Sequence, residues 1–314
     1  ILERALEGGY GFLHALAGVD VCEANNRAIE NMEIMHAHGE DKDKFFYCNL
    51  DIPYSDDEDC VEHVREQVSR KILKPLHENY GIDTSDDAIR AAVSEHNEVC
   101  RILTEIGELR KLDIPPITGY EYAVLVLVSY TCPKRLILPY LHETLEEIKS
   151  RKTDAEKDYR VRVVVVGSEI DDPQLIKLIE GCGALVVADR YCYGSFPGRQ
   201  EIILSDTEDA LTQVCRWYLQ NTECPRQSAM HRVKYRNDHV AQLIKDFNAD
   251  GAIYEQMKFC TYWSYERVIA SQVMPRDYGI HMLSIDRPYI SGQSGQLRTR
   301  VQAFVESLEI KKLR

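Results

Sequence analysis

The sequence contains no long hydrophobic run and no excess of basic residues. Its most apolar stretch, at residues 120–130, is much shorter than the roughly 18 residues that a membrane-spanning helix needs. Asp and Glu number 51 against 38 Lys and Arg, so the formal net charge is -13, whereas nucleic-acid binding requires clustered basic residues. These absences predict a soluble protein that neither spans a membrane nor binds nucleic acid. A single basic pocket for a phosphorylated small molecule is compatible with this charge.

A secretory signal is also absent from the sequence. The first nine residues, ILERALEGG, contain no Met, no basic leading segment and no signal-like apolar core. We therefore expect them to lie inside a longer protein, with part of an N-terminal domain preceding them. Ten cysteines without an export signal indicate a reducing compartment, in which thiols act as metal ligands, catalytic groups or core residues. The prediction is a cytoplasmic protein.

Several common catalytic and nucleotide-binding motifs are missing as well. No Gly-x-Gly-x-x-Gly follows an expected strand, and no Walker loop is present, which argues against a standard nicotinamide site or a P-loop. The ten histidines form no His-Glu-x-x-His or other metal-ligand spacing. A Gly-x-Ser-x-Gly elbow is also absent, so hydrolase chemistry has little support.

The hydrophobic pattern predicts an α/β fold. A strand, a helix and a second strand form a βαβ unit within residues 1–58, which we interpret as an incomplete N-terminal α/β domain. Residues 59–158 show helical spacing of apolar residues. The apolar run at 161–167 is the clearest buried parallel strand, and strands and helices alternate from there to residue 314. We expect two Rossmann-like (flavodoxin-like) parallel-sheet domains, with the second at 159–314 and a helical segment between them.

Three cysteines each lie just beyond a β-branched, apolar run. They are Cys22, Cys192 and Cys260. Because ligands of open α/β sheets bind at the carboxyl ends of the strands, these thiols can converge although they are far apart in the sequence. Three thiolates are too few to close a tetrahedral zinc site, but they suit an iron–sulfur cube with one open corner. The sequence therefore predicts one shared metal site.

An internal similarity supports the pairing of two of these cysteines. The segment CNLDIPY at 48–54 resembles LSIDRPY at 283–289, and each follows a strand, a cysteine and a helix. If the two βαβ modules are related, Cys22 and Cys260 occupy equivalent strand ends. Chance similarity of an Asp-x-Pro-Tyr strand end is the alternative.

Two other cysteines compete for the role of ligand. Cys224 lies in the loop ECPR, and a Cys-Pro pair often accompanies cluster ligands. Cys60 is a weaker candidate on a solvated helix. We interpret the thiols of Cys100, Cys182 and Cys215 as packing residues, because free cysteine is among the most buried residue types.

The segment SGQSGQLRTR at 291–300 opens the last expected helix and predicts an anion site. Ser294, Gly295 and the free helix amides can bind negative charge, with Arg298 and Arg300 as phosphate partners. Because the two arginines are spaced i, i+2, we expect at most one of them to reach the site. An ordinary helix start with a basic face, or an interface with a partner subunit, are the alternatives.

Two further polar residues lie at the carboxyl ends of expected neighbouring strands. Ser168 follows the strand at 161–167, and Gln256 ends the strand at 251–257. We predict that they donate hydrogen bonds to a thioester or to a cluster-bound water.

Four stretches in this chain carry a family resemblance. The segments VVVGSEIDDP at 164–173, VVADRYCYGS at 186–195, DGAIYEQMKFC at 250–260 and GQLRTRVQAFVE at 295–306 resemble the 2-hydroxyacyl-CoA dehydratase and benzoyl-CoA reductase superfamily. The match covers about half of the chain, from residue 160 onward. Upstream, the residues around Cys22 depart from the usual cysteine segment of that superfamily.

The resemblance implies a subunit that carries a [4Fe-4S] cluster on three cysteines and pairs with a related subunit in the cytoplasm of an anaerobe. An ATP-dependent iron–sulfur activator protein would supply one low-potential electron. In the dehydratases this electron converts the thioester carbonyl of an acyl-CoA substrate to a ketyl radical anion, which expels the 2-hydroxyl group as water, and the electron is recycled. An iron with an open coordination site can act as a Lewis acid there.

The resemblance leaves the reaction open. Dehydratases eliminate water from a 2-hydroxyacyl-CoA, whereas reductases of the benzoyl-CoA type add electrons to an aromatic thioester. A non-catalytic subunit that relays electrons or completes the interface is another hypothesis, and a structural zinc protein of α/β fold is a third.

Overall fold

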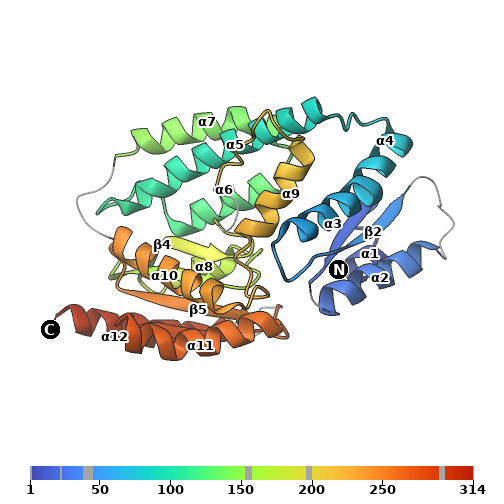
Figure 1. Cartoon of the computed structure of the whole chain (residues 1–314). Coiled ribbons are helices and arrows are strands. Elements are labelled where there is room, and N and C mark those ends of the chain that lie inside the picture. Colours follow the sequence, from blue (N-terminus) through green and yellow to red (C-terminus); the bar gives the residue numbers. More distant parts are fainter. Residues whose placement is uncertain are drawn as a thin grey trace. The chain divides into compact units, whose positions relative to one another are not determined.

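The computed structural model describes residues 2–21, 23–37, 45–152, 158–195, 200–289 and 294–313. The chain divides into two compact units, one formed by residues 1–93 with 202–222 and the other by 94–201 with 223–314. Figure 1 labels their helices and some of their strands. Cys22 and the predicted anion-binding residues 291–293 lie outside the described residues.

The first unit contains a two-stranded parallel sheet and several helices. The strands pair along their whole length, from Ala15 with Phe46 to Asp20 with Asp51. Its elements are α1 (Leu2–Leu6), β1 (Ala15–Asp20), α2 (Glu23–Ala37), β2 (Phe46–Asp51), α3 (Glu58–Val68), a π-helical turn (Ser69–Leu73), α4 (Lys74–Tyr80), the first part of α5 (Asp86–Glu108) and α9 (Ala210–Asn221). The predicted βαβ arrangement of β1, α2 and β2 is confirmed.

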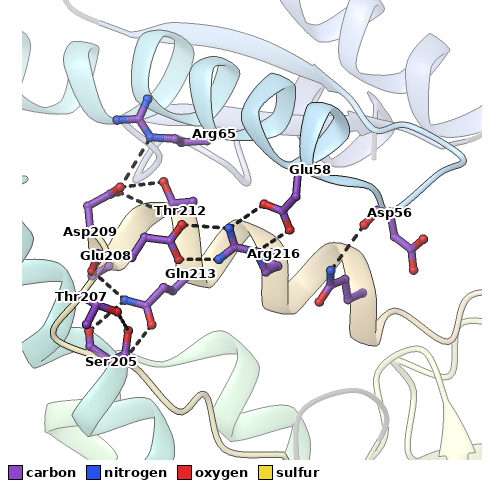
Figure 2. A network of polar contacts seen from close by, with 12 residues as sticks. Asp56, Glu58, Arg65, Ser205, Thr207, Glu208, Asp209, Thr212, Gln213 and Arg216 are labelled. Atoms are coloured by element: carbon purple, nitrogen blue, oxygen red, sulfur yellow. Dashed lines mark hydrogen bonds and ion pairs between the residues drawn. The ribbon is translucent and has the colours of Figure 1, made fainter.

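Helix α9 joins the first unit although it lies far along the chain. Its Arg216 donates to both carboxylate oxygens of Glu58 at 3.0 and 2.7 Å and to both oxygens of Glu208 at 2.5 and 2.9 Å, as Figure 2 shows. Arg65 of α3 lies 3.8 Å from Asp209, whose side chain caps α9 by accepting from the Thr212 amide. Paired charges of opposite sign on facing helices therefore hold α9 against α3.

The second unit contains a four-stranded parallel sheet. Its elements are the end of α5, a 3-10 turn (Leu109–Lys111), α6 (Gly119–Thr131), α7 (Lys134–Ser150), β3 (Val161–Gly167), α8 (Gln174–Glu180), β4 (Ala184–Tyr191), α10 (Met230–Asp246), β5 (Gly251–Met257), α11 (Thr261–Asp277), β6 (Met282–Arg287) and α12 (Ser294–Lys312). The strand order is β4-β3-β5-β6, with every neighbouring pair parallel. The chain reverses its direction of winding between β3 and β5, and ligands of open α/β sheets bind at such a point.

Both faces of this sheet are covered. Val163 and Val165 of β3 point to one face, where α8 and α12 supply Ile176, Val301 and other apolar residues. Val164 points to the opposite face, which α10 and α11 cover. This explains why β3 is an unbroken apolar run, since both of its sides are buried.

Helices α5, α6 and α7 form a separate apolar cluster. Ile102 and Ile106 of α5 pack with Val126 of α6 and Leu141 of α7, and all four side chains are buried. The helical spacing at residues 59–158 therefore marked true helices. The thiols of Cys100, Cys182 and Cys215 are also buried, as expected of packing residues.

The structure confirms a mixed α/β fold with parallel sheets. The arrangement as two Rossmann-like domains and the boundaries near residues 58 and 158 stay predictions. Within the described ranges, every helix is too short or too polar to traverse a lipid bilayer.

Candidate metal and substrate site

Ser168 joins three chain segments at the carboxyl edge of the four-stranded sheet. It follows β3 directly, and its carbonyl accepts a hydrogen bond from the Cys192 amide at 3.1 Å. Its hydroxyl accepts from the Met257 amide at 2.6 Å and donates to Glu255 at 2.9 Å. The residue is buried. Ser168 therefore fixes the loop that carries Cys192 against the end of β5, three residues before Cys260.

The thiols of Cys192 and Cys260 lie on the same side of this edge. Cys192 comes directly after β4, and Cys260 is the N-cap of α11, directly before its first turn. Both pack against the apolar cluster that contains Trp263. Burial raises the pKa of Cys192 well above its usual range, and the neighbouring thiols of Cys224 and Cys260 raise it further. The thiols of Cys224 and Cys260 thus both lie within electrostatic range of Cys192, and a ligand role for these cysteines stays a prediction.

Positive charges surround Cys224. Burial raises the pKa of its thiol, while the Arg226 amide and the guanidinium groups of Arg236, Arg226 and Arg190 lower it. Arg190 and Arg236 are themselves almost completely buried. These positive charges oppose the effect of burial without cancelling it, so the pKa of Cys224 stays above its ordinary value.

Carboxylates hold these buried arginines in place. Glu223 lies 2.6 Å from the Nε of Arg190 and 3.3 Å from the His239 ring. Glu266 accepts two hydrogen bonds from Arg236, at 2.7 and 2.9 Å. The bidentate geometry fixes the direction of the Arg236 guanidinium group.

Trp263 contributes a buried indole N–H beside Cys192. The side chain is 1% exposed, and its Nε1 atom has no hydrogen-bond partner of normal geometry among the described residues. The indole N–H nevertheless lies near enough to the Cys192 thiol to lower the pKa of that thiol. A buried donor of this kind is satisfied best when the sulfur is a thiolate, which accepts hydrogen bonds more strongly than a thiol.

Within the described residues, no three His, Cys, Asp or Glu side chains are grouped closely enough to hold a metal ion. Buried thiols with raised pKa values lose their protons when they bind iron. Cys22, the third predicted ligand, lies outside the described residues.

Glu255 is a buried carboxylic acid in the middle of this edge. It is 0% exposed, and burial raises its pKa to about 7. Arg287 Nε lies 2.8 Å from one carboxylate oxygen, and the amide and hydroxyl of Ser168 donate to the other, which opposes that rise. Glu255 is not among the site residues predicted from the sequence, although a glutamate inside a mostly apolar strand is a visible signal.

Gln256 is already engaged within the protein. Its side-chain oxygen accepts from the Nε of Arg267 at 2.8 Å, and Arg267 also donates to the hydroxyl of Ser284 at 2.5 Å. Ser168 and Gln256 do lie on neighbouring strands, as predicted. Binding of a ligand by either residue stays a prediction, and it requires exchange of these internal hydrogen bonds.

A cavity of about 490 Å³ lies beside this edge. It is lined by α8, the end of β6 and the first turns of α12, and both Arg298 and Arg300 contribute to its wall. Both arginines therefore line the same cavity, and the expectation that at most one of them reaches a bound ligand stays a prediction. Arg300 donates to the Ser284 carbonyl beside β6, and Arg298 lies near Gly181 at the end of α8.

Ser294 and Gly295 form the start of α12, as predicted. Gly295 is exposed, and a Cβ atom placed there would meet nothing within 4 Å. Close approach of neighbouring protein atoms is therefore not the reason for glycine at this position.

The chain matches a known family over nearly its whole length. The model of the 2-hydroxyglutaryl-CoA dehydratase, D-component, family matches residues 1–308. The chain belongs to this family, and the resemblance found in its sequence is confirmed.

Individual relatives are distant and differ in the reaction that their names state. A protein of Escherichia coli (strain K12) named as dehydratase subunit YjiM is 22% identical over 263 residues, which cover 82% of this chain and 67% of that protein. The (R)-phenyllactyl-CoA dehydratase beta subunit of Clostridium sporogenes is 22% identical over 98% of this chain and 78% of its own length. One of the benzoyl-CoA reductase subunits of Thauera aromatica is 20% identical over 83% of this chain and 67% of its own length.

Proposed function

We propose that the chain is the iron–sulfur subunit of a 2-hydroxyacyl-CoA dehydratase, a lyase that removes water from a 2-hydroxyacyl-CoA. The observation that carries the proposal is the fixation of Cys192 and Cys260 beside one another at the carboxyl edge of a parallel sheet, in a chain of this family. Three thiolates, from Cys22, Cys192 and Cys260, would hold a [4Fe-4S] cluster. When bound, the cluster would pass on the low-potential electron that the activator delivers and would offer an iron with a free coordination position.

The residues around this site have defined tasks under the proposal. Trp263 donates its indole N–H to the thiolate of Cys192, and Ser168 holds the Cys192 loop against β5. Glu255 can retain a proton near neutral pH, because its pKa is raised to about 7. Ser168 and Gln256 are proposed to orient the thioester, and Ser294, Gly295 and Arg298 to bind the CoA part.

The proposed assembly includes two other proteins. A related subunit forms a heterodimer with this chain, and an ATP-dependent iron–sulfur activator delivers the electron in the cytoplasm of an anaerobe. The names of the relatives support partner subunits, since each is named as one subunit of an enzyme. An iron with a free position reacts with oxygen, so exposure to air should release iron and abolish activity.

Iron and acid-labile sulfide analysis of the anaerobically purified chain tests the cluster. Serine variants of Cys22, Cys192 and Cys260 should each lose iron and sulfide, whereas Cys100→Ser, in a buried packing position, should retain both. A Cys224→Ser variant without cluster, alongside a Cys22→Ser variant with a full cluster, would transfer the third ligand to Cys224. Zinc in place of iron and sulfide would overturn the proposal.

A benzoyl-CoA reductase type of reaction is the second candidate, favoured by the similarity to the Thauera aromatica reductase. The complete heterodimer, with its activator and ATP, can be supplied in parallel with a 2-hydroxyacyl-CoA and with benzoyl-CoA. Formation of an enoyl-CoA from the first substrate supports the dehydratase. Reduction of the aromatic ring of benzoyl-CoA, with no dehydration of the 2-hydroxyacyl-CoA, would show that the reductase reaction is the correct one and overturn the dehydratase proposal.

A further inference from the structure

Helix α11 is apolar on both of its long sides. Its inner side packs Trp263 and Met274 into the core of the second unit, where both side chains are buried. Its outer side carries Tyr265, Val268 and Ile269, which are 67%, 55% and 41% exposed. A helix on the surface of a protein normally has polar and charged residues on its outer side, whereas a helix that is apolar all round is normally buried. This composition indicates a surface that another polypeptide covers.

The helix on the opposite face of the sheet has the ordinary composition. Helix α12 packs Val301 and Val305 into the core, and its outer side exposes Thr299, Gln302 and Glu306. The apolar outer side is therefore a particular property of α11, and the fold does not require it.

An exposed aromatic residue precedes α11. Phe259 is 91% exposed and has a φ of 74°, in a turn closed by a 3.1 Å hydrogen bond from the Cys260 amide to the Met257 carbonyl. Glycine is favoured at this third position of a turn, because a side chain on a residue of positive φ crowds the backbone. An apolar residue just before a helix often packs against the fourth helical residue, but here that residue is the polar Ser264. A strained residue of this kind indicates a contact made outside the chain.

The exposed residues of the outer side are spaced symmetrically along the helix. They are Thr261, Tyr265, Val268, Ile269, Gln272 and Arg276. Their spacing is unchanged when the helix is reversed about the point between Val268 and Ile269. Two copies of α11 can therefore pack antiparallel across a twofold axis, with Val268 of each against Ile269 of the other. In that arrangement Tyr265 lies opposite Gln272 of the other copy, and their hydroxyl and amide groups can form a hydrogen bond.

The ends of two antiparallel copies of α11 also complement each other. Arg276 is neutralised by Asp277 of its own chain at 2.6 Å, and the two copies of Arg276 would lie at opposite ends of the pair, roughly 20 Å apart at ~1.5 Å per residue. The same reversal brings Asp277 to the start of α11 of the other copy, where helix amides favour negative charge. It also brings Phe259 opposite Tyr278 of the other copy, which gives the exposed ring an aromatic partner.

The apolar area of this surface is of the size that a stable dimer needs. A fully exposed aromatic side chain presents ~200 Å², so Phe259 and Tyr265 together present roughly 300 Å². An interface of standard size buries ~800 Å² per partner, of which about 57%, or ~450 Å², is apolar. Val268 and Ile269 supply much of the remainder.

We infer that two copies of this chain form a twofold dimer through Phe259 and the outer side of α11. The contact uses neither the thiols nor the proposed pairing with a related subunit. With that pairing, it would give an assembly that contains two copies of each subunit. The inference therefore goes beyond the proposed function and does not depend on it.

Sedimentation equilibrium of the purified chain tests the inference. The wild type should have twice the mass of one chain at micromolar concentration. Val268→Glu and Val268→Lys should each raise the dissociation constant at least ~100-fold, because two like charges would then lie beside the twofold axis. An equimolar mixture of the two variants should form dimers again, since opposite charges would then face each other.

Two further variants complete the test. Leu136→Glu changes a residue of α7 that is 58% exposed, and as the matched control it should leave the dimer unchanged. Phe259→Gly suits the backbone better but should weaken the dimer at least about tenfold, the value of burying one aromatic side chain. Circular dichroism checks that each variant is folded.

Three results would overturn the inference. The first is a monomeric wild-type chain, including one whose α11 binds only a related subunit. The second is a dimer that both charged Val268 variants retain. The third is a mixture of these variants that stays monomeric although the wild type forms dimers, which would exclude the antiparallel contact.

Discussion

Glu255→Gln is expected to make folding less sensitive to pH. The Glu255 carboxyl is fully buried, and its pKa is raised from the ordinary value of 4.5 to about 7. A difference of this size corresponds to about 3 kcal/mol between the protonated and ionised forms, at ~1.36 kcal/mol per pH unit. Glutamine has the same shape as the protonated acid and can still accept the hydrogen bonds from Ser168.

The direction of the effect follows from where the proton is held. Below pH 4.5 the carboxyl is protonated in both the folded and the unfolded chain, so it has no influence on stability. Between pH 4.5 and about 7 the unfolded chain ionises while the folded chain keeps its proton, and the stability falls. Above pH 7 the stability contributed by the protonated Glu255 carboxyl is lost completely. Glu255→Gln should therefore match the wild type near pH 4.5 and exceed its unfolding free energy by up to about 3 kcal/mol at pH 8.

Urea unfolding of both proteins at several values between pH 4.5 and 8 measures this difference. Other titrating groups affect the two proteins alike, so the difference between the two curves isolates Glu255. Glu143→Gln, a change at an exposed position of α7, is the matched control and should follow the wild type throughout. If the free energies of unfolding of the wild type and Glu255→Gln differed by the same amount at every pH, a buried Glu255 that keeps its proton would be refuted.

Three further predictions concern the thiols and the core. Cys260→Ser should abolish the visible absorbance of the reconstituted cluster while Cys100→Ser retains it, and equal spectra would exclude Cys260 as a ligand. Trp263→Phe removes one N–H donor and should lower the midpoint potential of the cluster without loss of iron, because a hydrogen bond to a ligating sulfur favours the reduced form. An unchanged midpoint potential, measured by redox titration, would contradict the contact between Trp263 and Cys192. Arg110→Ala leaves the buried carboxylate of Asp189 without its 3.0 Å partner and should reduce the free energy of unfolding, measured in urea, by about 3–5 kcal/mol. A loss below about 1 kcal/mol would show that the ion pair is dispensable.

The regular elements of the second unit were predictable because their sequence patterns are local. The strand at 161–167 is apolar at nearly every position, and helices between the later strands have clear apolar spacing. The end of β4 does not follow from a local pattern. Asp189 and Arg190 are charged residues, but both are buried within the strand, where Arg110 and Glu223 neutralise them. Such partners cannot be read from a local pattern.

In the candidate site, too, only the features that follow from a local sequence pattern were predictable. The positions of Cys192 and Cys260 after strands followed from the pattern, since parallel strands place their carboxyl ends at one edge. The proximity of Cys224 did not, because it depends on the path of the chain between α9 and α10. Helix α9 belongs to the first unit, where its Arg216 pairs with Glu58, 158 positions earlier in the sequence, and a local pattern cannot show such a contact.

The excursion of residues 202–222 into the first unit has a consequence for synthesis on the ribosome. The chain passes between the two units at residues 93–94, 201–202 and 222–223. The first unit therefore lacks α9 until β3 and β4 of the second unit have already emerged. Domains usually fold in order from the N-terminus as they are made, but here neither unit can be completed before the other has begun. The face of α3 that pairs with α9 therefore stays uncovered while more than a hundred further residues are translated.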